Sequence, residues 1–273
     1  MDYKTILVHV DGDPRSAVRL NLAVALARRW DAHLVGLNVQ PLFGSPLYTA
    51  TDPLIVEHQH RAAEREAREA RALFDKTVAA AGLAGSEWRE DDRGVVDALV
   101  RHARYADLLV LGQREPRSVW SATAFTDEVL LAAGRPALVV PWAGDFATLG
   151  RRVLVAWNAG REAARALTDA LPLLRDADIV RVLTVNARDG DHGDVPGADI
   201  ALYLARHGLK VEVVRDEAVG IDIGAELLSR AADFQADLLV MGAWGHSRMR
   251  ELVLGGATRS LLGAMTLPVL MSH

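Results

Sequence analysis

The sequence predicts an α/β fold made of two tandem domains, each a five-stranded parallel-sheet sandwich. Two observations support this prediction. Strand-like apolar runs alternate with helical patterns along the whole chain, and three short segments recur in the same order in both halves. The runs at 106–112 and 236–242 are apolar throughout, which is typical of strands covered on both faces of a parallel sheet. We therefore expect helical crossovers of the usual right hand between the strands.

The repeat sets the domain boundaries. Its period is too long for a solenoid unit, so each copy should fold as a domain. We predict domains at 1–143 and 151–273, with the boundary in a short glycine-containing stretch between them. The matching pairs of segments are 5–11 with 152–158, 106–112 with 236–242, and 135–141 with 267–272.

The elements follow from periodicity, taken in chain order. Short apolar runs give the strands, and longer stretches with apolar residues at helical spacing give the helices. In the first half we expect strands at 5–10, 32–39, 86–90, 106–112 and 137–141, with helices at 14–30, 54–82, 94–104 and 122–133. In the second half we expect strands at 152–157, 178–185, 210–215, 236–242 and 268–272, with helices at 160–174, 195–207, 221–234 and 255–264.

Composition narrows the class of protein. The chain has 273 residues, half of them hydrophobic, and no cysteine, which excludes disulfides and thiolate metal sites. A net charge of −5 argues against a nonspecific nucleic-acid binder. The charged stretch 61–75 alternates signs, with Glu64 and Arg68 at i,i+4 spacing, so it predicts a solvated helix face. We find no secretory leader or membrane span in the sequence and expect a cytoplasmic protein.

The segment after the apolar run 236–241 carries the clearest functional signal. Glycines stand at Gly242, Gly245, Gly255 and Gly256, and Thr258 follows in a helix. Glycine lets main-chain N–H groups approach an anion closely, and a helix N-terminus adds its positive dipole end. In parallel sheets, ligands bind at the carboxyl ends of strands where the strand order reverses. A strand, a glycine loop and a helix in this order predict a phosphate-binding site.

The spacing Gly242-x2-Gly245-x9-Gly255, with the block GHSRMRELVLGGATRSLL around it, resembles the nucleotide-binding signature of the universal stress proteins. The resemblance extends over nearly the whole chain as a tandem form. It implies a Rossmann-like half with strand order 3-2-1-4-5 in each domain. It also implies ATP binding in members that keep the signature, and a role as a stress-associated sensor or interaction module.

Carried onto this chain, the resemblance implies an ATP site in the second domain. Adenine would lie near the ends of the first two strands, and the phosphates would lie over the glycine loop. Mg²⁺ is plausible with the triphosphate, although the sequence shows no protein ligand for it. The nucleotide-binding residues would be Ala156, Trp157, Asn158, Val185, Gly242, Gly245, His246, Gly255, Gly256, Ala257 and Thr258.

Two positions depart from the family pattern. Asn158 stands where an acid is usual, and Gly256 stands where Ser or Thr is usual. Losing one neutral hydrogen bond weakens binding by roughly 0.5–1.5 kcal/mol, and Thr258 is expected to compensate in part. The interpretation therefore keeps an adenine nucleotide in the second domain.

The first domain keeps Asp11-Gly12 but loses the glycine loop. Glu115 stands where Gly245 would be, Thr123 and Ala124 replace Gly255 and Gly256, and Asp127-Glu128 replace Arg259-Ser260. Carboxylates oppose a phosphate, and a Cβ blocks close approach of the main chain. We predict no nucleotide in the first domain.

Other chemistry has weaker support. His58 and His60 are spaced i,i+2 on a helix and point to different faces, which disfavours a metal site. The loop cluster Asp189, Asp191, His192 and Asp194 resembles ordinary solvated loop residues. Neither GxxxxGK[ST] nor GxSxG occurs, so we assign no catalytic residue. A slow ATPase or adenylyl-transfer enzyme using His246, and a ligand-free scaffold that keeps the loop only for its fold, remain as alternatives.

The fifth strands predict how the domains associate. Residues 137–140 and 269–271 are short apolar runs, each behind a proline, and an uncovered apolar edge is an aggregation hazard. Family members commonly pair this edge with its counterpart. We expect the two copies to pair within the chain as an intramolecular pseudo-dimer, with a further homodimer as the expected assembly.

Overall fold

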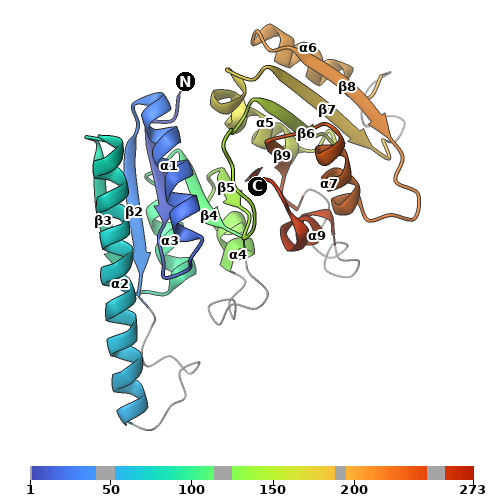
Figure 1. Cartoon of the computed structure of the whole chain (residues 1–273). Coiled ribbons are helices and arrows are strands. Elements are labelled where there is room, and N and C mark those ends of the chain that lie inside the picture. Colours follow the sequence, from blue (N-terminus) through green and yellow to red (C-terminus); the bar gives the residue numbers. More distant parts are fainter. Residues whose placement is uncertain (1, 41–52, 114–124, 188–194, 245–255) are drawn as a thin grey trace. The chain divides into compact units, whose positions relative to one another are not determined.

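The computed structural model describes residues 2–40, 53–113, 125–187, 195–244 and 256–273. These residues form two compact units (Figure 1). The first contains Asp2–Gly112 and the helix that ends at Ala132, and the second contains Gln113 and Pro136–His273. Each unit is described by itself below.

The first unit is a parallel sheet of strand order β3-β2-β1-β4 with helices on both faces. The two apolar central strands, β1 and β4, are buried along almost their whole length. Its elements are β1 (Thr5–His9), α1 (Ser16–Trp30), β2 (His33–Val39), α2 (Pro53–Ala81), β3 (Ser86–Asp91), α3 (Val95–Ala103), β4 (Leu108–Gly112) and α4 (Phe125–Ala132).

The second unit has strand order β5-β10-β9-β6-β7-β8. From β10 to β8 all pairs are parallel, so the second repeat has the predicted order 3-2-1-4-5. Its elements are β5 (Ala137–Val140), β6 (Arg152–Ala156), α5 (Arg161–Leu174), β7 (Ile179–Val185), α6 (Ala198–Arg206), β8 (Val211–Asp216), α7 (Ile223–Asp233), β9 (Leu238–Gly242), α9 (Ala257–Ala264) and β10 (Val269–Ser272).

The fifth strands of the two repeats pair with each other inside the second unit. β5 and β10 are antiparallel, with Val139 opposite Val269 and Leu138 opposite Leu270. All four residues are fully buried, so the pairing covers two apolar strand edges that would otherwise be exposed. By packing, β5 therefore belongs to the second unit, although by sequence it ends the first repeat.

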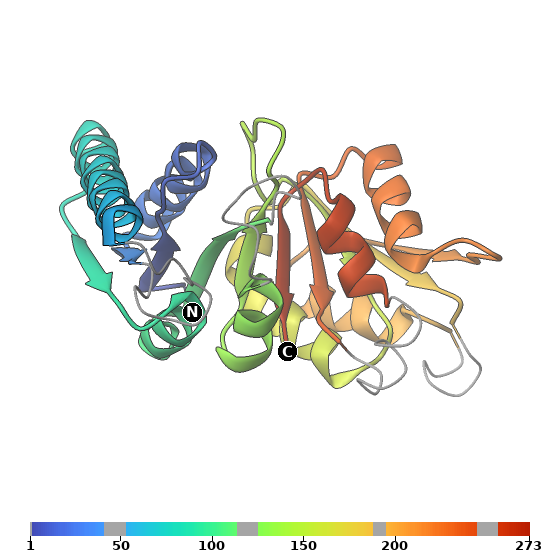
Figure 2. The same cartoon turned by 90° about the horizontal axis from the view of Figure 1, so that it is seen from below.

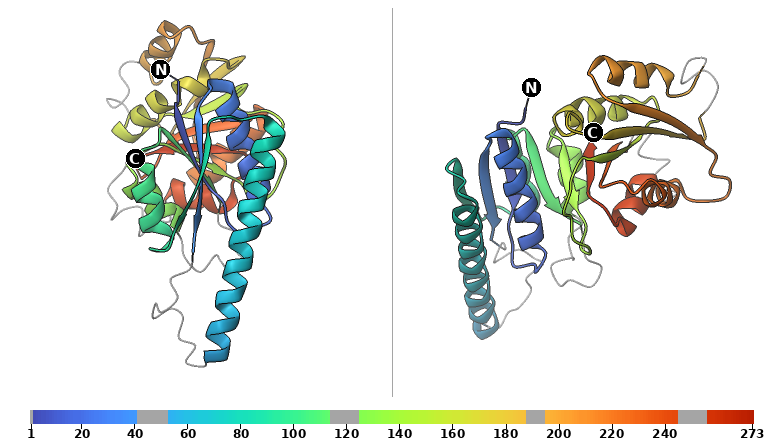
Figure 3. Two further views of the ribbon diagram at one scale, coloured as in Figure 1. Left: turned by 90° about the vertical axis from the view of Figure 1, so that its left-hand side faces the viewer. Right: turned by 45° about the horizontal axis from the view of Figure 1, so that its top comes forward.

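Helices cover both faces of each sheet (Figure 2). In the first unit α1 and α2 lie on one face and α3 and α4 on the other, and in the second unit α5 and α6 lie opposite α7 and α9. Helix α2 is the longest element and runs well beyond the strands of its own unit (Figure 3). The predicted order of strands and helices is confirmed, with end positions shifted by a few residues where the ends are described.

Candidate functional site

The site predicted in the second repeat lies at the carboxyl edge of its sheet. β6 pairs with β7 on one side and with β9 on the other, so the strand order reverses at β6. The register places Ala156 opposite Met241, which brings the residues that follow, Trp157 and Gly242, side by side. The expected meeting of the first-strand and fourth-strand loops is therefore present in the fold.

Asn158 forms the turn between β6 and α5. Its side-chain Oδ1 accepts a hydrogen bond from the Gly160 N–H at 2.9 Å, and Ala159 between them has a positive φ of 57°. A main-chain N–H requires an acceptor, so this bond fixes which end of the amide faces the turn. The Nδ2 group is then the donor at the free end of the amide, whereas an aspartate here would present a second acceptor.

Val185 ends the neighbouring strand β7 and is half-buried. The next residue, Asn186, has a positive φ of 49° and exchanges two side-chain hydrogen bonds with the main chain of Ala218. These bonds hold the turn after Val185 against the end of β8. The backbone beside the predicted adenine position is therefore fixed by the protein itself.

Gly242 ends β9 where the N-terminus of α5 approaches it. A Cβ on Gly242 would lie 2.5 Å from both the Ala163 nitrogen and the Glu162 carbonyl carbon, which are main-chain atoms. Any side chain would force the strand and the helix apart, so the close approach explains this glycine. It also brings the positive end of the α5 dipole to the strand end where phosphate is predicted.

Glu162 adds a carboxylate that the sequence analysis did not consider. Its side chain is buried in the first turn of α5 and pairs with Arg161, which is exposed. Burial raises the pKa of Glu162, but the hydrogen bond and charge of Arg161 outweigh burial and leave that pKa below its ordinary value. The carboxylate beside Gly242 is therefore paired with the positive charge of Arg161 and is not an unpaired negative charge.

The residues after Gly242 are tied to α9. The Trp244 N–H donates to the Thr258 hydroxyl at 3.2 Å, and Trp244 has a positive φ of 53°. Thr258 is only 2% exposed, so its hydroxyl oxygen serves the loop backbone. The Ala243 N–H donates to the Ser272 carbonyl at 2.8 Å, which anchors the same stretch to β10.

Gly256 precedes α9 as its N-cap, and Ala257 is the first residue of the helix. Both are half-buried at the helix N-terminus, where unpaired main-chain N–H groups favour an anion. The predicted residues Gly245, His246 and Gly255 lie outside the described residues. The structure therefore describes the floor and two helix ends of the predicted site.

Helix α9 is held in place by contacts with α7, and the sequence did not predict these contacts. A Cβ on Gly224 would lie 2.8 Å from the Ala257 carbonyl oxygen, so the two helices pack main chain against main chain. Asp222 caps α7 by accepting from the Ala225 N–H at 3.0 Å, and it also accepts from the Ser260 hydroxyl. The signal in the sequence was Asp222, a common N-cap residue, with Gly224 two residues later at the start of a helix.

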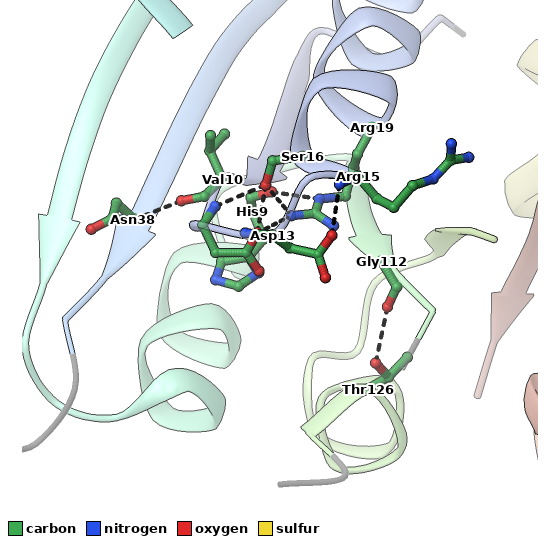
Figure 4. A network of polar contacts seen from close by, with 10 residues as sticks. His9, Val10, Asp13, Arg15, Ser16, Arg19, Asn38, Gly112 and Thr126 are labelled. Atoms are coloured by element: carbon green, nitrogen blue, oxygen red, sulfur yellow. Dashed lines mark hydrogen bonds and ion pairs between the residues drawn. The ribbon is translucent and has the colours of Figure 1, made fainter. Parts of the chain in front are cut away.

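The first repeat arranges the same edge differently (Figure 4). Asp11 follows β1, and the Arg19 guanidinium donates to its carboxylate at 2.7 Å and to the His9 carbonyl at 2.7 Å. The Ser16 hydroxyl also donates to Asp11, at 2.5 Å. A Cβ on Gly112 would lie 2.3 Å from an Arg19 guanidinium nitrogen, so the side chain spans from the end of β1 to the end of β4. An internal cation occupies the crevice that corresponds to the predicted nucleotide site.

The electrostatics of this cluster follow from its burial. Burial alone raises the pKa of Asp11, but the charge of Arg19 and the hydrogen bonds from Ser16 and Arg19 hold it well below its usual range. Burial lowers the pKa of His9 from 6.5 to about 4, so His9 is neutral at physiological pH. The first repeat thus holds an ion pair between a buried guanidinium and a carboxylate that is 33% exposed, and its acid is engaged internally.

The other candidate residues from the sequence do not form a further site among the described residues. Glu115, Thr123 and Ala124 of the first repeat and the cluster Asp189, Asp191, His192 and Asp194 lie outside the described residues. His58 and His60 lie on α2, and the described part of the chain contains no group of three His, Cys, Asp or Glu residues placed to hold a metal. None of the described helices is both long enough and apolar enough to cross a membrane.

A surface groove of about 750 Å³ lies elsewhere, between α2 and the carboxyl ends of β2 and β3. Basic and acidic side chains line it together, so it favours no ligand of one charge. It is separate from the predicted nucleotide-binding residues. Its lining residues are Gln40, His60, Glu64, Ala67, Arg68, Arg71, Ala72, Asp75, Glu90 and Asp92.

Known proteins agree with this architecture. The sequence matches the universal stress protein family over residues 2–141 and 150–273. Universal stress protein Slr1230 of Synechocystis sp. is 25% identical over 224 residues, which span 79% of this chain and 76% of that protein. A universal stress protein from Archaeoglobus fulgidus has a similar fold, with a TM-score of 0.74 at 16% identity over 98% of this chain and 95% of that one. A protein of unknown function from Pseudomonas aeruginosa PAO1 has a TM-score of 0.61 at 14% identity over 99% and 92% of the two chains. The chain belongs to the universal stress protein family, with two family domains in tandem.

Proposed function

We propose that this universal stress protein binds an adenine nucleotide, ATP, in its second repeat and acts as a stress-associated sensor or interaction module. One observation carries the proposal. The Asn158 turn, the glycine end of β9 and the N-terminus of α5 converge at the point where the strand order reverses. This is where a parallel sheet binds ligands, and it is where the glycine-spaced loop begins.

The charge pattern at this edge supports a phosphate ligand. Helix α5 begins at Arg161 and helix α9 begins at Ala257, and both start just after predicted site residues. Each helix N-terminus contributes roughly half a positive charge and free N–H donors. The Glu162 carboxylate is offset by Arg161. Mg²⁺ would enter with the triphosphate, held by phosphate oxygens and water, since we identify no protein ligand for it.

The first repeat supports the same assignment by contrast. Arg19 already neutralises Asp11 and lies against Gly112, so the equivalent crevice is filled by the protein. A nucleotide would have to displace a buried guanidinium that makes three hydrogen bonds. One nucleotide per chain, in the second repeat, is therefore the expected stoichiometry.

Calorimetric titration and thermal shift with ATP, AMP and adenosine test the proposal. Ligand at about 100 times its dissociation constant stabilises the protein by about 2.7 kcal/mol. We expect saturation at one ATP per chain and loss of binding in Gly245→Glu, which places a carboxylate in the loop. The matched control is Gly263→Ala, because a Cβ at that glycine of α9 meets no atom within 4 Å.

The outcomes separate the alternatives. No stabilisation by ATP in the wild-type chain refutes the proposal and favours a ligand-free scaffold. Binding that Gly245→Glu leaves intact places the nucleotide elsewhere. Release of phosphate over hours that is lost in His246→Ala favours the slow ATPase.

A further inference from the structure

The outer edge of the second sheet is formed by β8. Among the described strands it pairs only with β7, so one side of its main chain is open. Open edges are sites of pairing with other chains, and proteins usually protect them with charged residues. β3, which ends the sheet of the first unit, follows that rule, since four of the six residues in SEWRED are charged. β8 reads VEVVRD, with three valines and three charged residues, so it is less charged and more apolar than β3.

Exposed apolar side chains gather around this edge. Ten large hydrophobic residues are exposed in the described part of the chain, and six of them lie between residues 195 and 223. They come from the residues just before α6, from α6, from β8, from the turn between β8 and α7, and from the first residue of α7. They are Val195, Leu202, Val213, Val219, Ile221 and Ile223, with Val219 the most exposed at 82%. A cluster of this kind beside an open edge marks an interaction surface.

The direction of the β8 main-chain groups follows from its bonds to β7. The Lys210 and Asp216 carbonyls accept from the Val180 and Asn186 N–H groups at 2.9 and 3.0 Å. Main-chain groups alternate in direction along a strand, so the residues of even number point toward β7. The N–H and C=O groups of Val211, Val213 and Arg215 therefore point outward and are available to a partner strand.

A second copy of the chain offers a matching strand. In a symmetric antiparallel pair the twofold axis passes through one residue, and residues equally far from it lie opposite each other. A centre at Glu212 sets Glu212 against itself. A centre at Val214 sets Glu212 against Asp216. Like charges directly opposite each other are unfavourable in a strand pair, although Glu212 and Asp216 also pair with Arg181 and Arg230 within their own chain, which reduces the repulsion.

A centre at Val213 instead places opposite charges across from each other. It places Lys210 opposite Asp216 twice, once on each side of the axis, and brings the two Val213 side chains together. Val211 then lies opposite the alkyl stem of Arg215. Lys210 is exposed at the start of β8 and is available for this pair.

We propose that two copies of this protein associate through β8 in an antiparallel pair centred on Val213. The pair joins two sheets edge to edge through the outward main-chain groups, and the exposed apolar side chains of α6 and of the turn after β8 border the contact. The surface is separate from the β5–β10 pairing, which is satisfied within one chain.

Disulfide trapping gives a direct test, because the chain has no cysteine. In a hydrogen-bonded antiparallel pair the two Cα atoms lie about 5.5 Å apart, within the range that a disulfide spans. We expect Val213→Cys to form a covalent dimer at least about tenfold faster than two controls under mild oxidation. Tyr105→Cys is the control for exposure, since Tyr105 is 76% exposed and lies in the other unit. Glu212→Cys is the control for register.

Light scattering on the full chain gives the second measurement. The wild type should have twice the 29.6 kDa mass of one chain. Val213→Pro removes only an outward N–H, so it should yield a folded monomer by circular dichroism, and Lys210→Glu should weaken the dimer. A wild type that stays monomeric at high concentration overturns the proposal. A dimer that Val213→Pro leaves intact, or equal cross-linking at positions 213, 212 and 105, also overturns it.

Discussion

Arg19 should be needed in the first unit to compensate the charge of Asp11, and Arg19→Met tests this. The methionine keeps the apolar stem but removes the guanidinium. Arg19 is 3% exposed, and its guanidinium donates hydrogen bonds to Asp11, Ser16 and the His9 carbonyl. Removing one partner of a fully buried ion pair costs about 3–5 kcal/mol. The Asp11 side chain is 33% exposed, so solvent screens the charge left behind and the expected cost is about 1–3 kcal/mol. We expect a loss of that size in the free energy of unfolding of the first unit.

The dependence on pH distinguishes this mechanism from simple loss of packing. In the wild type the pKa of Asp11 is depressed, so its stabilisation is complete above its ordinary value of 3.8 and is lost only as pH falls through the folded value. Without Arg19, burial raises the pKa of Asp11, and acid then neutralises the unpaired charge. The difference between variant and wild type should therefore shrink between about pH 7 and about pH 4.

Urea denaturation followed by tryptophan fluorescence measures the loss, and hydrogen exchange at the amides of β1 and α1 assigns it to the first unit. The double variant Asp11→Asn with Arg19→Met should recover much of the stability, because it removes the unpaired charge. A loss below about 1 kcal/mol, or one that does not change with pH, would refute the reasoning.

Two further predictions concern His9 and Gly242. Because the pKa of His9 is about 4 in the fold and about 6.5 when unfolded, acidification from about pH 7 to about pH 4 should lower the free energy of unfolding by about 3 kcal/mol, and denaturation of His9→Leu should lack this component. A Cβ at Gly242 meets the main chain of α5 at 2.5 Å, so Gly242→Ala should lower the free energy of unfolding by about 1–3 kcal/mol and weaken nucleotide binding in the same calorimetric titration. Gly263→Ala, in the open space on α9, should be neutral or stabilising by up to about 1 kcal/mol. Equal losses for the two glycine variants would contradict the packing argument.

Much of the fold was predictable because its central strands are short and apolar. Runs such as LLVLG and LLVMG exclude an amphipathic helix, and their recurrence at matching places in both halves sets the repeat. The pairing of β5 with β10 was also expected, because two short apolar edges on one chain are stabilised by covering each other and because the resemblance implied such pairing. Its antiparallel direction was not predicted.

The interior of each crevice was less predictable, because side-chain direction is set by packing. The sequence showed Asp11 as a retained ligand-facing acid, whereas the structure pairs it with Arg19. A signal was present, since Arg19 stands between apolar residues on the buried face of α1. Thr258 was expected to offer its hydroxyl to the ligand, and the structure ties that hydroxyl to the Trp244 N–H.

The two repeats carry different charges at the carboxyl edge of their sheets. Counting from the matched residues Asp11 and Asn158, the position of Arg19 corresponds to Ala166, which is fully buried. The first repeat thus supplies both an anion and a cation from its own chain, and its crevice is complete without a ligand. The second repeat has neither charge at these two positions. It keeps the N-terminus of α5 pressed against Gly242, with Glu162 paired to Arg161. Because an arginine at position 166 without an acid at position 158 would be a buried charge without a partner, the absence of both charges is consistent with the proposal of an external phosphate at this edge.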